Sequence, residues 1–180
     1  MAIRVRRALF QDAPGIARVH VDTWRSTYRG IISDDYLDGL DYGRSQKNWE
    51  DGITDPSHRT TFFVAEDDEV GIVGFAACGR VRDNKWGYSG ELYAIYLNQD
   101  MQRKGSGKRL VLSVTRDLKA RGLDSMLVWV LEENPYKRFY ESIGGTYVGT
   151  SEISVGGKKL KELGYGWRDL DSLISRLATD

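Results

Sequence analysis

A glycine-containing turn between an apolar segment and a basic helix is the feature of this sequence that points most directly to chemistry. The segment reads IYLNQDMQRKGSGKRLV, residues 95–111, and Gly105 and Gly107 lie near its centre. A helix that begins at such a turn leaves its first N–H groups without acceptors, and its dipole favours an anion. Glycine has no side chain to keep a phosphate away from the backbone. Four basic residues surround the two glycines: Arg103, Lys104, Lys108 and Arg109.

Two common nucleotide-binding loops do not fit this turn. A P-loop would need glycine at Gln102 and serine or threonine at Arg109. The dinucleotide-binding fingerprint would need glycine at Leu110. These mismatches disfavour a nucleotide-phosphate protein, whereas a purely structural turn before a helix stays open.

Two further segments accompany the turn in a recognisable order. GELYAIYL precedes it at residues 90–97, and VWVLEENPYKRFYESIGG follows it at residues 128–145. Together the three segments resemble the GNAT superfamily of acetyl-CoA-dependent N-acetyltransferases, over roughly residues 60–145 and, less closely, the first strand and helix. The resemblance implies a mixed α/β fold, a mostly antiparallel sheet with helices on both faces. It also implies acetyl-CoA as co-substrate and no metal.

The resemblance places the coenzyme on main-chain groups of two segments. The diphosphate would bind N–H groups of seven residues: Gln102, Arg103, Lys104, Gly105, Ser106, Gly107 and Lys108. The strand at Ile95, Tyr96 and Leu97 would separate from its neighbour and pair with the pantetheine arm. The N–H of Leu97 would then stabilise the oxyanion of the thioester. Core packing is the alternative for these side chains and is compatible with a role for their backbone.

Three residues after the next strand complete the implied coenzyme site. Asn134 would hold the pantetheine or the chain, although it could equally cap the helix after Pro135. Arg138 could reach the nucleotide phosphates or be an ordinary surface cation. Tyr140 would protonate the leaving thiolate, and the alternative is a core tyrosine with a solvated hydroxyl.

Direct transfer to an amine also needs a base. A primary amine with a pKa near 10 is mostly protonated at pH 7, and removing that proton costs about 4 kcal/mol. Glu91 shares the strand alternation of Ile95 and Leu97, so we expect it to face the same cleft and accept the proton. A solvent-facing or salt-bridged glutamate is the alternative. His20 and His58 have no evident partner in the sequence.

The acceptor is expected among the segments that the family shares least. Trp24 and Tyr28 lie four residues apart and would share a helix face, with core packing as the alternative for Trp24. Four acids could attract a cationic amine or simply be solvated: Asp34, Asp35, Asp38 and Asp41. We expect a small-molecule primary amine, such as a polyamine or an amino acid. A protein N-terminal or lysine acetyltransferase and a non-catalytic acyl-CoA sensor stay open, although Glu91 and Tyr140 favour catalysis.

The elements that must position these residues are expected to form one domain over residues 1–180. Residues 1–58 would supply a strand and the acceptor-side helices, 60–145 the acetyl-CoA-binding core, and 146–180 the last hairpin and a tail. Within them the patterns predict strands at 3–9, 60–66, 70–81, 90–97, 125–131, 146–155 and 158–167, and helices at 12–24, 33–40, 43–53, about 106–121, 135–143 and 169–178.

Composition excludes several partner classes. The 26 basic residues balance 26 acidic ones, so no overall field favours nucleic acid or an anionic membrane. No apolar run reaches the length of a membrane span. The single cysteine, Cys78, rules out an internal disulfide and fits a reducing compartment, so we expect the cytoplasm. A homodimer is an open expectation for the assembly.

Overall fold

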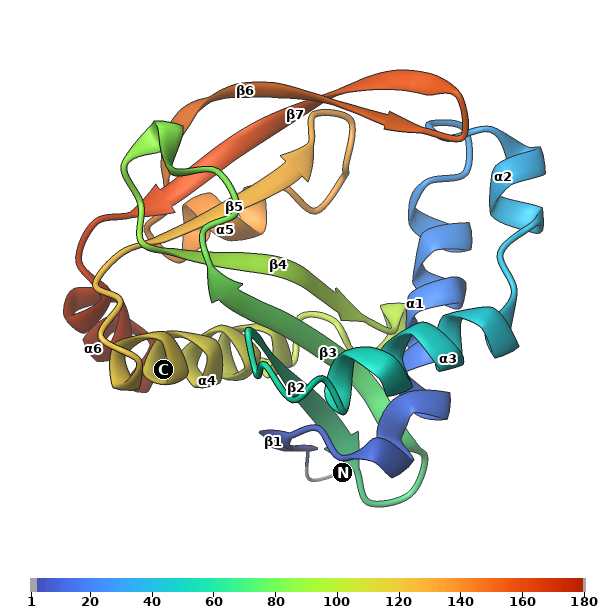
Figure 1. Ribbon diagram of the computed structural model, residues 1–180, viewed down its shortest axis with the longest axis horizontal. Helices are drawn as coiled ribbons and strands as arrows, with labels where there is room; N and C mark the ends of the chain where they lie inside the picture. Colours follow the sequence, from blue (N-terminus) through green and yellow to red (C-terminus); the bar gives the residue numbers. More distant parts are fainter. Residues whose placement is uncertain (1–2, 180) are drawn as a thin grey trace.

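The computed structural model describes residues 3–179, and its strands form one seven-stranded sheet in the order β1-β2-β3-β4-β5-β7-β6 (Figure 1). Neighbouring strands are antiparallel except β4 and β5, which are parallel. This confirms the predicted mixed fold with a mostly antiparallel sheet. The strands are β1 (Ile3–Arg7), β2 (Thr60–Asp67), β3 (Gly71–Arg80), β4 (Gly90–Leu97), β5 (Met126–Leu131), β6 (Thr146–Val155) and β7 (Lys158–Trp167).

Six α-helices within residues 3–179 cover the two faces of the sheet. The adjacent β2 residues Phe63 and Val64 belong to different core clusters, one with α4 and α6 and the other with α1. Because alternate residues of a strand point to opposite faces, these helices lie on opposite sides. None of the helices described is both long and apolar enough to cross a bilayer. They are α1 (Ala13–Thr27), α2 (Asp34–Asp38), α3 (Tyr42–Ile53), α4 (Ser106–Ala120), α5 (Arg138–Ser142) and α6 (Leu170–Ala178).

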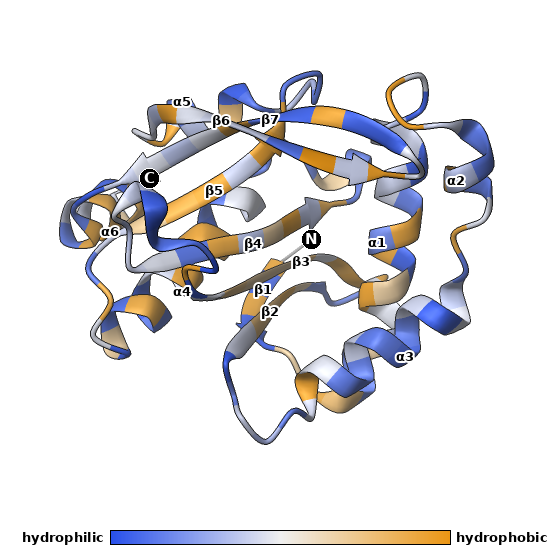
Figure 2. Ribbon diagram, turned by 45° about the horizontal axis from the view of Figure 1, so that its top comes forward, coloured by the Kyte–Doolittle hydropathy of each residue, from blue (hydrophilic) through white to orange (hydrophobic). Residues whose placement is uncertain are grey.

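The main core lies between the sheet and the helices α4 and α6. Strand β5 is hydrophobic along nearly its whole length, as expected for a strand that is covered on both faces (Figure 2). The helices contribute apolar residues at helical spacing: Leu110, Val114 and Leu118 from α4, and Leu170, Leu173 and Leu177 from α6. This packing fixes the N-terminus of α4, and with it the glycine turn, against the end of β4.

A β-bulge in β4 changes which residues share a face. Ala94 pairs with Ala77 of β3 but Leu92 pairs with Cys78, so Tyr93 is one extra residue in β4. Leu92 and Ile95 consequently both pack in the α4 core, although three positions separate them. The expectation that Glu91 faces the same side as Ile95 and Leu97 is therefore wrong. The extra residue resets the strand alternation, and Glu91 faces the α1 side with Tyr96.

Strands β4 and β5 separate along their C-terminal halves. Their pairing ends at Leu92 and Val128, although β4 continues to Leu97 and β5 to Leu131. Figure 1 shows the two strands diverging beyond this point. The gap between Tyr93–Leu97 and Trp129–Leu131, which we call the strand gap, leaves one edge of each strand without a neighbour.

The β6–β7 hairpin closes over the α1 side of the sheet. The tip of the hairpin lies next to α2 (Figure 1). There the amine of Lys158 donates to the carbonyl of Ile31 at 2.9 Å. A second apolar cluster fills the space below the hairpin, with residues from the C-cap of α1, the following loop, α2, β5 and β7: Tyr28, Ile32, Leu37, Leu131 and Leu160. The hairpin thus joins the segments on which the acceptor was predicted.

Candidate functional site

The glycine turn holds a group of main-chain donors without acceptors. Gly105 is the N-cap of α4 with φ of 82°, and Arg103 takes the left-handed conformation with φ of 60°. Within residues 3–179, no acceptor receives the N–H groups of five consecutive residues, which we call the amide turn: Arg103, Lys104, Gly105, Ser106 and Gly107. Unpaired N–H groups at a helix N-terminus are suited to an anion.

Gln102 does not belong to this group of donors. Its N–H donates to the carbonyl of Gln99 at 3.2 Å, and its side chain donates to the carbonyl of Leu97 at 3.3 Å. The prediction that its main-chain N–H serves a phosphate is therefore wrong, because a 3₁₀ turn at Gln99–Met101 already uses it. Lys108 lies in the first turn of α4.

The surroundings of the amide turn leave room for a ligand. A methyl group added to Gly105 would meet no atom within 4 Å. The hydroxyl of Ser106 is buried, and no described residue is its hydrogen-bond partner. A buried hydroxyl without a partner is costly, so a ligand that supplies an acceptor would relieve this cost.

Gly107 serves a different purpose from the one that the sequence suggested. A Cβ atom there would lie 3.3 Å from the ring of Phe139 and 3.5 Å from the side chain of Leu97. The glycine lets α5 approach α4 closely. Its N–H remains a free donor, but its missing side chain makes room for Phe139.

The end of β4 presents its backbone to the strand gap. The N–H of Asn98 donates to the carbonyl of Val73 in the β3 direction, at 2.9 Å. Successive N–H groups of a strand point to opposite edges, so the N–H of Leu97 and that of Ile95 point into the gap. An extended, amide-containing ligand could pair with β4 there. The side chains of Ile95 and Leu97 pack in the α4 core, while the side chain of Tyr96 faces α1.

Tyr140 lies beside this gap on α5. It is 8% exposed, and its ring stacks on that of Tyr165 at 6.0 Å. No hydrogen bond joins its hydroxyl to a described residue, and burial raises the pKa of the phenol well above its ordinary range. The hydroxyl therefore keeps its proton at neutral pH. Arg138 is exposed at the first position of α5.

Asn134 joins the end of β5 to helix α1. Its side-chain oxygen accepts from the N–H of Tyr136 at 2.8 Å, and its amide nitrogen donates to the hydroxyl of Tyr28 at 3.2 Å. The turn-capping alternative is thus present. The Trp24 and Tyr28 rings lie 5.0 Å apart, and the Trp24 and Tyr96 rings 6.4 Å apart. These aromatic rings line the α1 side of the site.

Most of the acids predicted to attract a cationic amine already have an ion-pair or hydrogen-bond partner. Arg29 pairs with Asp34 at 3.2 Å and with Asp38 at 2.9 Å. Asp41 accepts from the N–H of Arg44 at 2.7 Å and caps α3. Only Asp35 among the four has no such contact in the described chain. They do not form an open site for a cation.

Glu91 is buried and tied to one arginine. It is 1% exposed, and its carboxylate accepts from the Arg82 N–H at 2.9 Å, the Nε at 3.0 Å and an Nη at 2.5 Å. The guanidinium also lies over the ring of Tyr93, 4.9 Å from its centroid. The salt-bridged alternative for Glu91 is therefore the one observed.

Glu162 on β7 is a candidate that sequence reasoning missed. Its side chain is half-buried and accepts no hydrogen bond from residues 3–179, and burial raises the pKa of its carboxyl above the ordinary value. It shares a face with Leu160, two residues earlier, which packs in the cluster with Tyr28. The period-2 pattern of KKLKELGYGW was the available signal, but nothing in it placed β7 beside β5.

The two histidines have different surroundings, and only the ring of His20 lies beside those of Trp24 and Tyr96. His20 has a partner that the sequence did not show, since its Nδ1 lies 3.1 Å from the hydroxyl of Ser45. Burial lowers the pKa of His20 to about 4, so its ring is neutral at pH 7. His58 lies in an exposed turn with φ of 47°. Residues 3–179 contain no group of three or more metal-ligating side chains.

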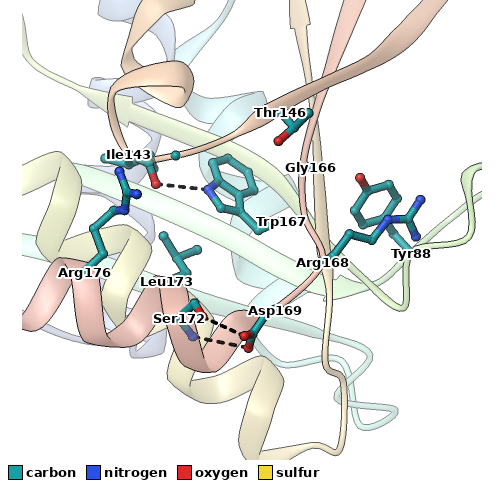
Figure 3. A pocket seen from close by; sticks show the side chains of 11 residues that line it. Tyr88, Ile143, Thr146, Gly166, Trp167, Arg168, Asp169, Ser172, Leu173 and Arg176 are labelled. Carbon is teal, nitrogen blue, oxygen red and sulfur yellow. Dashed lines mark hydrogen bonds between the residues drawn. The ribbon is translucent and has the colours of Figure 1, made fainter.

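A separate hollow of about 440 Å³ lies between the end of β7 and α6 (Figure 3). Its polar groups are mostly used internally, since Asp169 caps α6 through Ser172 and Arg168 donates to the carbonyls of Gly87 and Trp86. None of the predicted site residues lines it. It has no part in the arrangement described above.

Comparison with known proteins gives consistent matches. Residues 75–153 match the family model described as FR47-like protein. The "Uncharacterized N-acetyltransferase YuaI" of Bacillus subtilis (strain 168) is 40% identical over 175 residues, which are 97% of this chain and 98% of that protein. The spermidine N(1)-acetyltransferase of Thermoplasma acidophilum is 24% identical over 136 residues, 74% of this chain and 81% of that protein.

A solved structure has the same fold. It is the PaiA N-acetyltransferase from Thermoplasma acidophilum in complex with coenzyme A, with a TM-score of 0.70 and 23% sequence identity. The match covers 90% of this chain and 98% of that chain. The arrangement of strands and helices therefore agrees over nearly the whole of both proteins.

Proposed function

We propose that this chain, which belongs to the GNAT superfamily of N-acetyltransferases, moves the acetyl group of acetyl-CoA to the primary amine of a small molecule. The observation that carries the proposal is the amide turn beside the strand gap. Five free N–H groups suit a diphosphate, and an unpaired strand edge suits the peptide-like pantetheine arm. The chain is an acyltransferase that uses acetyl-CoA, and the small-molecule acceptor is the part of this function that we propose.

The amide turn and the strand gap would hold acetyl-CoA in one extended conformation. The diphosphate accepts from the N–H groups of residues 103–107, and the exposed Arg103 and Lys104 side chains add positive charge. The pantetheine pairs with β4 at Ile95 and Leu97. The thioester oxygen then lies near the N–H of Leu97, which stabilises negative charge as the tetrahedral intermediate forms.

Tyr140 would supply the proton to the departing thiolate. Its buried hydroxyl has no partner among the described residues and keeps its proton at neutral pH. A thiolate is a better leaving group when a nearby acid protonates it. The position of Tyr140 on α5, against α4 through Phe139 and Gly107, ties this acid to the amide turn.

The α1 side of the sheet favours a small cationic amine as acceptor. Aromatic rings of Trp24, Tyr28 and Tyr96 gather there, and such rings attract ammonium groups. The β6–β7 hairpin covers this side through its contact with Ile31, which favours a small molecule over a folded protein. A relative that is 24% identical is named for acetylating spermidine.

An acceptor panel that monitors free thiol tests the proposal. Spermidine, amino acids, amino sugars and a lysine-containing peptide are each mixed with acetyl-CoA and the protein. We expect at least one small amine to raise thiol release well above background. Release with the peptide alone would favour a protein acetyltransferase, and release with none, despite acetyl-CoA binding, would favour a sensor. A thermal-shift comparison of acetyl-CoA with ATP and NAD measures that binding, since a ligand at 100 times its Kd stabilises by about 2.7 kcal/mol.

A further inference from the structure

Two glutamates face the α1 side of the sheet near the strand gap, and their surroundings differ. Glu91 pairs across β4 and β5 with Leu127, below the point where the strands separate. Its carboxylate receives three hydrogen bonds from Arg82. Both of its oxygens already accept hydrogen bonds from Arg82, so neither is open to receive the ammonium group of a substrate. Glu91 is therefore better suited to fixing Arg82 than to proton transfer.

Glu162 lies farther along the gap with a free carboxylate. It pairs with Leu131, the last residue of β5, where β4 has already moved away. Its side chain is half-buried, and no described residue donates a hydrogen bond to it. On the same face, Leu160 packs with Tyr28, whose hydroxyl receives a hydrogen bond from Asn134. This carboxylate thus lies between the gap and the aromatic rings of the acceptor side.

We propose that Glu162, and not Glu91, receives the ammonium group of the acceptor and removes its proton. The proposal rests on the proposed function, because it assigns the base of that same reaction. An ammonium is positive, and a half-buried carboxylate without an ion-pair partner is the complementary group. The neighbouring rings of Trp24 and Tyr28 would hold the carbon chain of the amine.

The charged groups around Glu162 tune it for this role. Burial raises the pKa of its carboxyl, the nearby Glu91 raises it further, and Arg82 lowers it. Tyr28, which lies near it at the C-cap of α1, is neutral because burial raises the pKa of its phenol. A carboxylate with a raised pKa is a stronger base than an ordinary one.

The reaction balances with two proton carriers. The ammonium gives one proton to Glu162, and the neutral amine forms a C–N bond with the thioester carbon. The C–S bond then breaks and Tyr140 gives its proton to the sulfur, while the amide nitrogen loses a second proton that restores Tyr140. Glu162 releases its proton to solvent. The products are the acetylated amine, coenzyme A with its thiol, and one proton.

The test is the pH dependence of kcat/KM for an amine, in wild-type protein and in Glu162→Gln. The matched control is Glu152→Gln, an exposed carboxylate on the same hairpin. Wild type and control should show a plateau between the pKa of Glu162 and that of the amine. Glu162→Gln needs the free amine, so its kcat/KM should rise tenfold per pH unit up to the amine pKa. At pH 7 the kcat/KM of Glu162→Gln should be about 10²- to 10³-fold below that of wild type, and the difference between the two proteins should become smaller toward pH 10.

The Kd of acetyl-CoA shows whether the variant is folded, and it should be unchanged. A Glu162→Gln protein that keeps the plateau and works within threefold of wild type overturns the assignment but leaves the proposed function intact. A plateau lost in Glu91→Gln and kept in Glu162→Gln also overturns it. A wild-type protein that acetylates no amine overturns both.

Discussion

At the scale of single residues, Tyr140 links the structure to the chemistry most closely. Replacing it with phenylalanine removes only the hydroxyl and keeps the ring that stacks on Tyr165. We expect kcat to fall about 100-fold or more, since a positioned acid contributes about 10²–10⁴ in rate. The Kd of acetyl-CoA should stay within twofold, as measured by calorimetry. Tyr136→Phe, on the exposed chain just before α5, is the control and should keep full activity.

The hydroxyl of Ser106 gives a second test at this scale. It is buried and has no partner in the described chain, so Ser106→Ala removes an unsatisfied group. The thermal unfolding temperature of the free protein should stay equal or rise slightly. The Kd of coenzyme A should increase about tenfold, because a hydrogen bond to a charged phosphate contributes about 1.5–3 kcal/mol. Ser113→Ala on the same helix is the control, and equal affinities in the two variants would exclude a role for the Ser106 hydroxyl.

At the scale of elements, the contact of α4 with α5 positions the acid relative to the donors. Gly107→Ala would place a methyl group 3.3 Å from Phe139 and move α5. Overpacking of this kind costs about 1–3 kcal/mol of unfolding free energy. We expect that loss in urea unfolding, together with a lower kcat, because Tyr140 follows Phe139 directly. Gly43→Ala in the exposed helix α3 should instead be close to neutral, because its methyl group would lie 3.3 Å only from the end of the exposed Asp41 side chain, which can move aside. A Gly107→Ala protein with wild-type stability and kcat would contradict this account of the contact.

Most elements could be predicted because their signals are local. The apolar period of α4 and its glycine start are visible in the sequence, as are the glycine-flanked hairpins. The bulge at Tyr93 could not be, since it depends on how β4 pairs with β3 across thirteen or more residues. The expected face of Glu91 was wrong for that reason alone.

The parts of the site that consist of main-chain groups could be predicted from the sequence. The parts that depend on contacts between distant segments could not. The free amides after Arg103 follow from a glycine turn that opens a helix, whatever the side chains. The ion pair of Glu91 with Arg82 joins a strand to a loop of irregular conformation. The place of Glu162 depends on β7 lying between β5 and β6, which local patterns do not determine.

At the scale of the whole molecule, the buried His20 makes stability depend on pH. Its pKa is about 4 in the folded protein and near 6.5 when unfolded. Between these values the unfolded chain binds more protons than the folded protein. The contribution of His20 to the free energy of unfolding is therefore complete above pH 6.5 and is lost as the pH decreases toward 4. The loss is at most about 3 kcal/mol. Glu162, whose pKa is raised, acts in the opposite direction.

Urea unfolding at pH 7 and pH 5 measures this effect. Wild-type protein and His58→Gln should lose the same free energy of unfolding between the two pH values. His20→Gln should lose clearly less, because the group that titrates differently in the two states is gone. Parallel losses in all three proteins would mean that His20 does not cause the dependence.

A crystal structure of the protein with coenzyme A tests the central claim most directly. We predict that diphosphate oxygens accept hydrogen bonds, at 2.7–3.2 Å, from N–H groups of the amide turn. We also expect the pantetheine arm to lie in the strand gap, paired with β4 at Ile95 and Leu97. A bound coenzyme whose diphosphate lies away from residues 103–107, with the pantetheine outside the gap, would contradict it.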